Sequence, residues 1–179
     1  MPLTADQVAK ATGKPAANVA KVWPLVVLAL AERNIGQDLV LVCAAATIAT
    51  ETPAFFPLRE YRANAIRQPK LYAQQEKYWD TGFYGRGLVQ TTHRENYEAV
   101  RDEIGTDVVA QPDLLLDPHW AAQALAVYFR DHNLHLAALQ QDWRKCRKLV
   151  NGGFNGYDAF SGFVDRLLTA ANIVRKPES

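Results

Sequence analysis

Apolar positions recur along most of this chain at the three-to-four-residue spacing of amphipathic helices, whereas strand-type alternation is weak throughout. Thr4-Ala5-Asp6-Gln7 has the composition of a capping box and predicts a short first helix that ends near Gly13. At most a small hairpin is expected, around 58–61 and 84–89. Further helices are predicted at 16–34, 39–50, 94–104, 118–132, 142–150 and 157–174.

The segment after Asp38 is small or apolar nearly all round, which predicts a helix buried on most sides, with Asp38 as its cap. Pro24 lies inside the preceding predicted helix and is expected to break or kink it. The fold class that follows is mainly α. The 179 residues are expected to form a single domain, 1–179, with a sizeable core.

Composition narrows the function classes only slightly. The formal net charge is +1, so the chain as a whole gives no argument for binding nucleic acid or an anionic membrane. The apolar run at 22–31 is too short to span a bilayer, and the first residues lack the pattern of a signal peptide. Cys43 and Cys146 are expected to be free thiols.

Two carboxylates stand out because a proline-interrupted turn separates them. An uninterrupted helix would place Glu51 and Glu60 roughly 13.5 Å apart along its axis and on opposite faces. Pro53 and Pro57 prevent that helix and allow the chain to reverse. Glu51 would then end a buried helix, where partial burial raises a carboxyl pKa as a general acid requires. A solvated glutamate at a helix end is the plainer alternative.

Glu60 lies beside Arg59, and a carboxylate kept ionised by a cation suits a general base that activates water. A surface charge is the simpler interpretation, and Glu76 and Asp80 compete for the role of base. The stretch from Tyr61 to Phe83 is irregular and aromatic, and predicts long loops with one short helix.

Polar residues capable of holding a sugar follow this stretch. Gly85-Arg86-Gly87 allows a tight turn and close approach to a ligand, although two glycines alone are a weak signal. Gln90, Thr91 and Thr92 add one amide and two hydroxyls before a helix; alternatively one threonine is only the N-cap of that helix, paired with Glu95. Asn151-Gly152-Gly153 is also explained by a helix C-cap. The four histidines lack the spacing of a metal site, so no metal is expected.

Taken together, the motifs are more specific than any one of them. Their order resembles that of glycoside hydrolase family 19, and more narrowly its phage endolysin branch, such as the glycosidase domain of mycobacteriophage lysin A. The resemblance covers roughly residues 3–174. It rests on Thr-Glu-Thr (50–52), Arg-Glu (59–60), Tyr-Gly-Arg-Gly-Leu-Val-Gln-Thr-Thr-His (84–93), Asn-Tyr (96–97) and Val-Asn-Gly-Gly-x-Asn-Gly (150–156).

The resemblance implies a lysozyme-like helical fold with two lobes and a central cleft, an inverting mechanism and no cofactor. It implies that Glu51 is the general acid, Glu60 the general base and Thr92 a residue that holds the attacking water. The substrate-binding positions that it implies, with those suggested by the Gly-Arg-Gly segment, are Tyr84, Arg86, Gln90, Asn96, Asn151 and Arg166, the last as a buried arginine near the acids. Thr50 departs from the histidine that the family commonly has before the acid.

The function expected from this resemblance is hydrolysis of the β-1,4 bonds of peptidoglycan by a monomeric endolysin, made in the host cytoplasm without a signal peptide and acting on the wall after release. Neither nucleic acid nor membrane insertion is expected. A chitinase acting on N-acetylglucosamine polymers is the nearest alternative, and a non-catalytic wall-binding module is another. A nucleic-acid binder has only the basic cluster at 144–148 in its favour, and a solvated helix face explains that cluster more simply.

Overall fold

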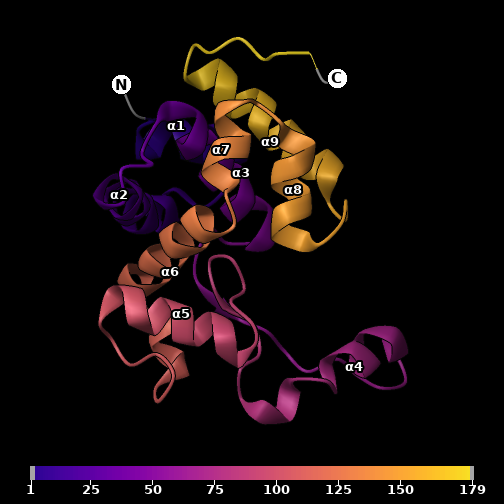
Figure 1. The fold of residues 1–179 in the computed structure, drawn as a ribbon. Coiled ribbons are helices and arrows are strands. Elements are labelled where there is room, and N and C mark those ends of the chain that lie inside the picture. Colours follow the sequence, from indigo (N-terminus) through magenta and orange to yellow (C-terminus); the bar gives the residue numbers. More distant parts are fainter. Residues whose placement is uncertain (1–2, 178–179) are drawn as a thin grey trace.

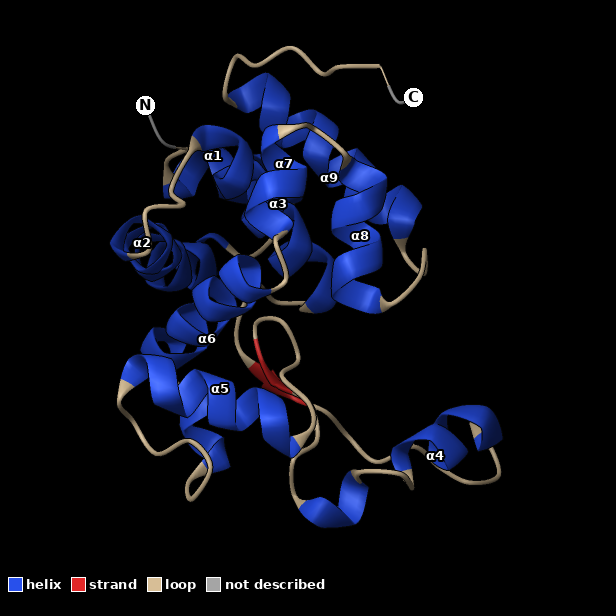
Figure 2. Cartoon of the chain, viewed as in Figure 1, coloured by secondary structure: helices blue, strands red, loops and turns tan. Residues whose placement is uncertain are grey.

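The computed structural model describes residues 3–177, and within them nearly all regular structure is helical (Figures 1 and 2). The prediction of a mainly α fold with one small hairpin is therefore confirmed. The helices are α1 (Ala5–Thr12), α2 (Ala16–Glu32), α3 (Asp38–Glu51), α4 (Pro69–Gln75), α5 (Arg94–Ile104), α6 (Pro118–Asp131), α7 (Leu134–Leu139), α8 (Trp143–Asn151) and α9 (Tyr157–Ala170). Two short 3₁₀ turns, η1 (Trp79–Thr81) and η2 (Pro112–Leu116), complete the helical elements.

Two hydrophobic cores lie on either side of α6. The larger core gathers side chains from α1, α2, α3, α7, α8 and α9, and the smaller one gathers Phe83 with residues of α5 and η2. Leu125 and Phe129 of α6 face the larger core, whereas Ala124 and Val127 face the smaller one. Figure 1 shows the same division, with α5 on one side of α6 and the larger group of helices on the other. The helix α6 thus contributes side chains to both cores and lies between the two lobes.

The helix α3 lies at the centre of the larger core. Every residue from Val40 to Ala49 is buried, as its nearly all-round apolar sequence predicts. Glu51 is its last residue. Since Ile48 and Ala49 belong to the larger core, the position of Glu51 is set by the core rather than by a loop.

The chain reverses directly after Glu51, where Pro53 precludes further helix. The Lys14 ammonium donates to the carbonyls of Thr52 (3.2 Å) and Pro53 (3.1 Å), and the side chain of Asn18 donates to the Ala54 carbonyl (2.9 Å). Phe55, with a φ of 52°, is fully buried in the larger core. The turn between the two acids is therefore fixed by the loop and helix that follow α1.

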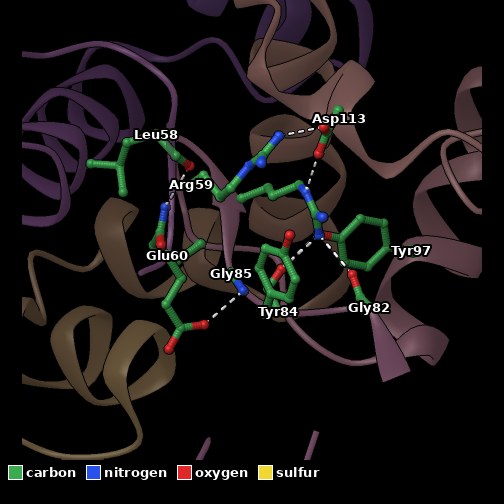
Figure 3. A network of polar contacts seen from close by, with 10 residues as sticks. Leu58, Arg59, Glu60, Gly82, Tyr84, Gly85, Tyr97 and Asp113 are labelled. Atoms are coloured by element: carbon green, nitrogen blue, oxygen red, sulfur yellow. Dashed lines mark hydrogen bonds and ion pairs between the residues drawn. The ribbon is translucent and has the colours of Figure 1, made fainter. Parts of the chain in front are cut away.

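The strands β1 (Leu58–Arg59) and β2 (Arg86–Gly87) form the predicted hairpin, antiparallel and with Leu58 opposite Gly87. Arg59 stands opposite Arg86, which places two cations side by side. Asp113 of η2 bonds to both: its Oδ1 accepts from Arg86 Nε at 2.7 Å, and its Oδ2 pairs with Arg59 (Figure 3). This shared carboxylate offsets the repulsion and fastens the hairpin to the smaller lobe.

Leu88 and Val89, just beyond β2, belong to the larger core. A Cβ on Gly87 would lie 3.3 Å from the Leu115 carbonyl oxygen, and Gly87 has a φ of 89° that disfavours any other residue. The hairpin thus packs against both cores. This packing explains how a pairing of only two residues per strand can be stable.

Several element boundaries differ from those predicted. The helix α2 continues through Pro24 without a break, because its packing against α1 and α6 holds it together. Asp38 is the first residue of α3 rather than its cap, which is Gln37. The helix predicted to end at 132 is followed by an unpredicted helix, α7, after Asn133 in a left-handed conformation. The last helix ends at Ala170, short of 174.

The segment from Tyr61 to Phe83 contains α4 and η1, in agreement with the predicted loops and single short helix. In Figure 2 it stands away from both lobes as an arm with α4 at its far end. Within residues 3–177, no helix has both the length and the apolar character needed to cross a membrane.

Candidate active site

Glu51 is paired with an arginine that comes from a distant part of the sequence. The Arg147 guanidinium of α8 contacts Glu51 Oε1 through one Nη, and donates from Nε to the Asn155 carbonyl at 2.7 Å. The Arg147 side chain is 4% exposed and that of Glu51 is 17% exposed. An ion pair this buried holds the Glu51 carboxyl in one orientation, although the Glu51 side chain is not fully shielded from solvent.

The loop 152–156 completes this half of the site. A Cβ on Gly156 would lie 3.3 Å from an Arg147 Nη and 3.5 Å from the Thr50 methyl group, so a larger residue would crowd both. Gly156 also has a φ of 71°. The Thr50 hydroxyl donates to the Ala46 carbonyl at 2.8 Å inside α3, so it is engaged within its own helix. Glycine is thus needed here for both backbone and space.

Glu60 is held by three hydrogen-bond donors. Its Oε1 accepts from the Gln75 side-chain amide and from the Tyr78 hydroxyl, each at 2.8 Å, and its Oε2 accepts from the Gly85 backbone N–H at 2.8 Å (Figure 3 for the last). Gln75 is itself buried and also bridges the Tyr61 carbonyl and the Ala63 N–H. The arm that carries Gln75 and Tyr78 therefore fixes the orientation of Glu60.

The Tyr78 hydroxyl donates a hydrogen bond to Glu60 and keeps its proton. Burial, followed by the hydrogen bond to Glu60, raises the pKa of the Tyr78 phenol well above its usual value. The phenol therefore remains protonated throughout the range in which the enzyme would work. Oε1 accepts two hydrogen bonds and Oε2 only one, so Oε2 keeps a free lone pair.

Gln90 and Gly85 lie directly beside Glu60. A Cβ on Gly85 would approach Gln90 Oε1 to 2.8 Å and Glu60 Oε2 to 3.2 Å, so only glycine fits between them. The Gln90 amide donates to the carbonyls of Leu58 (3.1 Å) and Gly87 (3.2 Å), across the hairpin. The structure thus brings Glu60, Gly85 and Gln90 together, as the joint motif implies.

Thr92 and Asn96 are connected to Gln90 by successive hydrogen bonds. The Thr92 hydroxyl donates to the Gln90 carbonyl at 2.9 Å, and the Asn96 amide donates to the Thr92 carbonyl at 2.6 Å. The cap position of α5 is His93, and no side chain caps it. The alternative in which Thr91 or Thr92 serves only as that N-cap is therefore wrong.

The family model described as chitinase class I, glycoside hydrolase family 19, matches residues 60–160, more than half of the chain. The chain belongs to glycoside hydrolase family 19. The matched segment includes Glu60, Gln90 and Arg147, whereas Glu51 lies outside it.

Two relatives and one solved structure show how far the likeness to other family 19 proteins extends. Chitinase 11 of Oryza sativa subsp. japonica is 40% identical over 101 residues, which are 55% of this chain and 37% of that protein. A glycosyl hydrolase family 19 domain-containing protein of Haemophilus influenzae is 32% identical over 100 residues, 55% of this chain and 48% of that protein. The alignments thus span less than half of either relative.

Chitinase C from Streptomyces griseus has the same fold, with a TM-score of 0.70 and 21% identity over 98% of this chain and 79% of that one. This chain and chitinase C therefore share the same helical fold over nearly the whole of this chain.

Arg166 is not the arginine near the acids, and that assignment is wrong. Its Nε donates to the Ala11 carbonyl at 2.6 Å, and its guanidinium lies 5.1 Å from the Phe163 ring. It follows Gly156 by ten residues of α9, roughly 15 Å along the helix axis. Arg147 occupies the place that the resemblance gave to Arg166.

Sequence reasoning missed Arg147 because it treated the basic cluster at 144–148 as one solvated face. A signal was present nonetheless. Trp143, Cys146 and Arg147 share one face of α8 at a spacing of three and four residues, and all three are buried. A cation on the apolar face of an amphipathic helix indicates a buried partner.

Arg86 has a structural role instead of the expected contact with substrate. It is 4% exposed, and besides Asp113 it donates to the carbonyls of Gly82 (2.8 Å) and Tyr84 (3.2 Å) and to the Tyr97 hydroxyl (3.1 Å). Figure 3 shows these partners surrounding the guanidinium. Tyr97 is buried, which raises the pKa of its phenol to about 12. Arg86 therefore ties the arm to α5 and the hairpin.

The remaining predicted positions are more open. The Tyr84 ring stacks on Trp79 at 4.4 Å with Arg86 over its other side at 3.9 Å, so it is one layer of a stack that extends through Arg62 to Tyr72 on the arm. Asn151 ends α8 as an exposed residue before Gly152, which is the expected left-handed cap. Glu76 and Asp80 are exposed on the arm, whereas Glu60 is partly buried among its three donors.

We expect Tyr78→Phe to lower kcat/KM roughly tenfold, since a hydrogen bond to a charged group contributes on the order of 1.5 kcal/mol or more. The loss should fall on kcat, because the base is misoriented while the substrate contacts remain. Initial rates of glycan hydrolysis check this. Tyr72→Phe is the matched control: its hydroxyl makes no hydrogen bond among the described residues. Equal kcat in the parent and Tyr78→Phe would contradict the proposed orientation of the base.

Proposed function

We propose that this family 19 domain hydrolyses the β-1,4 glycosidic bonds of bacterial peptidoglycan by an inverting mechanism, in the manner of a phage endolysin. The observation that carries the proposal is the contrast between the two carboxyls. Glu51 ends a rigid helix and is paired with Arg147, and Glu60 is held by three donors with one oxygen edge free. An inverting glycosidase needs one fixed acid and one fixed base on opposite faces of the sugar ring.

In the proposed mechanism, the protonated form of Glu51 reacts: its carboxyl gives a proton to the oxygen of the leaving sugar, and solvent restores that proton after the step. The carboxylate that results is stabilised where it forms by the adjacent Arg147, an interaction that strengthens along the reaction coordinate. Glu60 takes a proton from the attacking water, and the Thr92 hydroxyl oxygen helps to place that water. The mechanism requires roughly 6.5–9.5 Å between the two carboxyls, to leave room for the water.

Peptidoglycan is favoured by what the chain lacks as well as by its motifs. Nine positions separate the acids, as in the short-loop lytic members that the sequence resembles. The only two cysteines are buried as free thiols, so no disulfide ties long loops around the site. Hydrolysis of chitin is the second candidate, because the rice and Streptomyces proteins are both named chitinases.

The test is release of reducing sugar from purified peptidoglycan and from colloidal chitin under matched conditions. We expect faster turnover of peptidoglycan, and NMR of the first products should show inversion at the anomeric carbon. Faster turnover of chitin would move the assignment to chitinase. Binding to walls with no release of sugar from either polymer would make the chain a non-catalytic wall-binding module.

A further inference from the structure

The outer face of α8 carries a compact group of cations beside an exposed aromatic ring. Arg144, Lys145 and Lys148 are exposed, and Phe154, three residues beyond the end of α8, is 48% exposed. We call these four residues the α8 patch. None of its three cations pairs with a carboxylate among residues 3–177. The nearest acid along the chain, Asp142, accepts from the Lys145 backbone N–H as the helix cap.

The patch surrounds a hollow with an apolar floor. The hollow has a volume of about 620 Å³ and is lined by Arg144, Lys145, Lys148, Leu149, Gly152 and Phe154. The Arg144 guanidinium lies 4.6 Å from the Phe154 ring centroid and 5.2 Å from that of Tyr157. The two rings meet edge to face at 6.3 Å. Stacking of the cation on two rings holds the aromatic wall of the hollow in place.

The patch lies on the same helix as Arg147, the partner of the proposed acid. Arg147 lies on the inner face of the same helix and pairs with Glu51, and it also donates to the carbonyl of Asn155, the residue after Phe154. A polymer held near Glu51 therefore has the α8 patch on the neighbouring surface of the same helix and loop.

The chemistry of the patch selects one kind of occupant. Sugar rings present apolar faces that pack on aromatic side chains, and a glycan substituted with carboxylates presents negative charges at intervals along its strand. A neutral glycan would use only Phe154 and Leu149 and leave the three cations unpaired.

We propose that the α8 patch is a second binding surface for a carboxylate-bearing glycan strand, distinct from the pair of acids. This second proposal rests on the proposed function and adds that the preferred ligand is an anionic polymer. Its test is nevertheless a measurement of binding, so it succeeds or fails separately from catalysis.

The experiment measures sedimentation of the full chain with three insoluble probes at low salt. They are peptidoglycan sacculi, the same sacculi with their carboxylates converted to neutral methylamides, and colloidal chitin. Glu51→Gln serves as the background so that the probes stay intact. The test variant is Lys145→Ala/Lys148→Ala. Its matched control is Lys10→Ala/Lys21→Ala, which removes the same charge from exposed positions on α1 and α2.

We expect the α8 double variant to bind unmodified sacculi roughly three- to tenfold more weakly than the control, as two partly solvated ion pairs would give. The difference should shrink as salt shortens the screening length. It should vanish on amidated sacculi and on chitin. Phe154→Ala should weaken binding to all three probes, and Phe154→Tyr should restore it.

The proposal is overturned if the two double variants bind sacculi equally, or if the loss is as large on amidated sacculi. It is also overturned if a single-stranded DNA oligonucleotide displaces the chain from sacculi through the same two lysines and binds more tightly than the wall. Sugar release by the parent is scored separately. If the α8 double variant binds sacculi more weakly but the parent releases no sugar, the α8 patch is supported and the proposed function is refuted. If the parent releases sugar but the two double variants bind equally, the proposed function is supported and the α8 patch is refuted.

Discussion

Glu51→Gln is expected to lower the rate of sugar release from peptidoglycan by roughly 10²–10⁴-fold, the range that general acid catalysis supplies. Glutamine has the same shape and can still bond to Arg147, but it has no proton of suitable acidity to give to the leaving oxygen. The loss should appear in kcat with little change in the amount of wall bound. Initial rates and sedimentation of the same preparation check both quantities.

The control for this variant is Glu76→Gln. Glu76 is exposed on the arm, and its carboxylate bonds to no described residue. We expect it to retain the activity of the parent. If Glu76→Gln or Asp80→Asn were the inactive variant and Glu51→Gln remained active, the acids would have to be reassigned to the arm.

Arg147→Met should have the largest effect on stability. Removing one partner of a buried ion pair leaves the other charge uncompensated, so we expect the free energy of unfolding to fall by about 3–5 kcal/mol. Urea denaturation monitored by tryptophan fluorescence measures this change. Activity should fall as well, because the Glu51 carboxyl loses the group that orients it and stabilises its ionised form after proton transfer.

Lys145→Met, on the exposed face of the same helix, is the matched control and should change the free energy of unfolding by less than about 0.5 kcal/mol. A double-mutant cycle adds a stricter test. In the Glu51→Gln background, Arg147→Met should cost less than in the parent, because glutamine does not leave a buried charge behind. Equal costs in the two backgrounds would mean that the bond to the Asn155 carbonyl, not the pair with Glu51, accounts for the stability.

The patterns of apolar residues predicted most of the helices, and for a local reason. The helix from Arg94 to Ile104 has the predicted bounds, and the capping box at Thr4 is present with both of its hydrogen bonds. Helical periodicity and end signals are properties of short segments, so the sequence carries them directly. Where packing overrides local preference, the prediction was wrong, as at Pro24, whose penalty within α2 is outweighed by burial of Val22, Trp23 and Val26.

In the candidate site, too, the sequence showed the local features and only the structure showed the contacts between distant residues. Its local motifs were visible in the sequence, including Glu51 at a helix end, the turn at Pro53, and the hairpin that carries Gly85 and Gln90. The partners of the acids were not. Arg147 lies 96 residues from Glu51, and Gln75 and Tyr78 belong to an arm that has no helical periodicity to place it.

The sequence by itself therefore determined that the chain is helical, where most of its helices lie and which family motifs it carries. Only the tertiary structure decided that Arg147 rather than Arg166 meets Glu51, that Arg86 is a structural tie, and that three donors orient Glu60. The physical reason is that a hydrogen-bond or ion-pair partner is chosen by the packing of helices far apart in sequence. Periodicity shows which face of each helix is buried, but not which other helix that face meets.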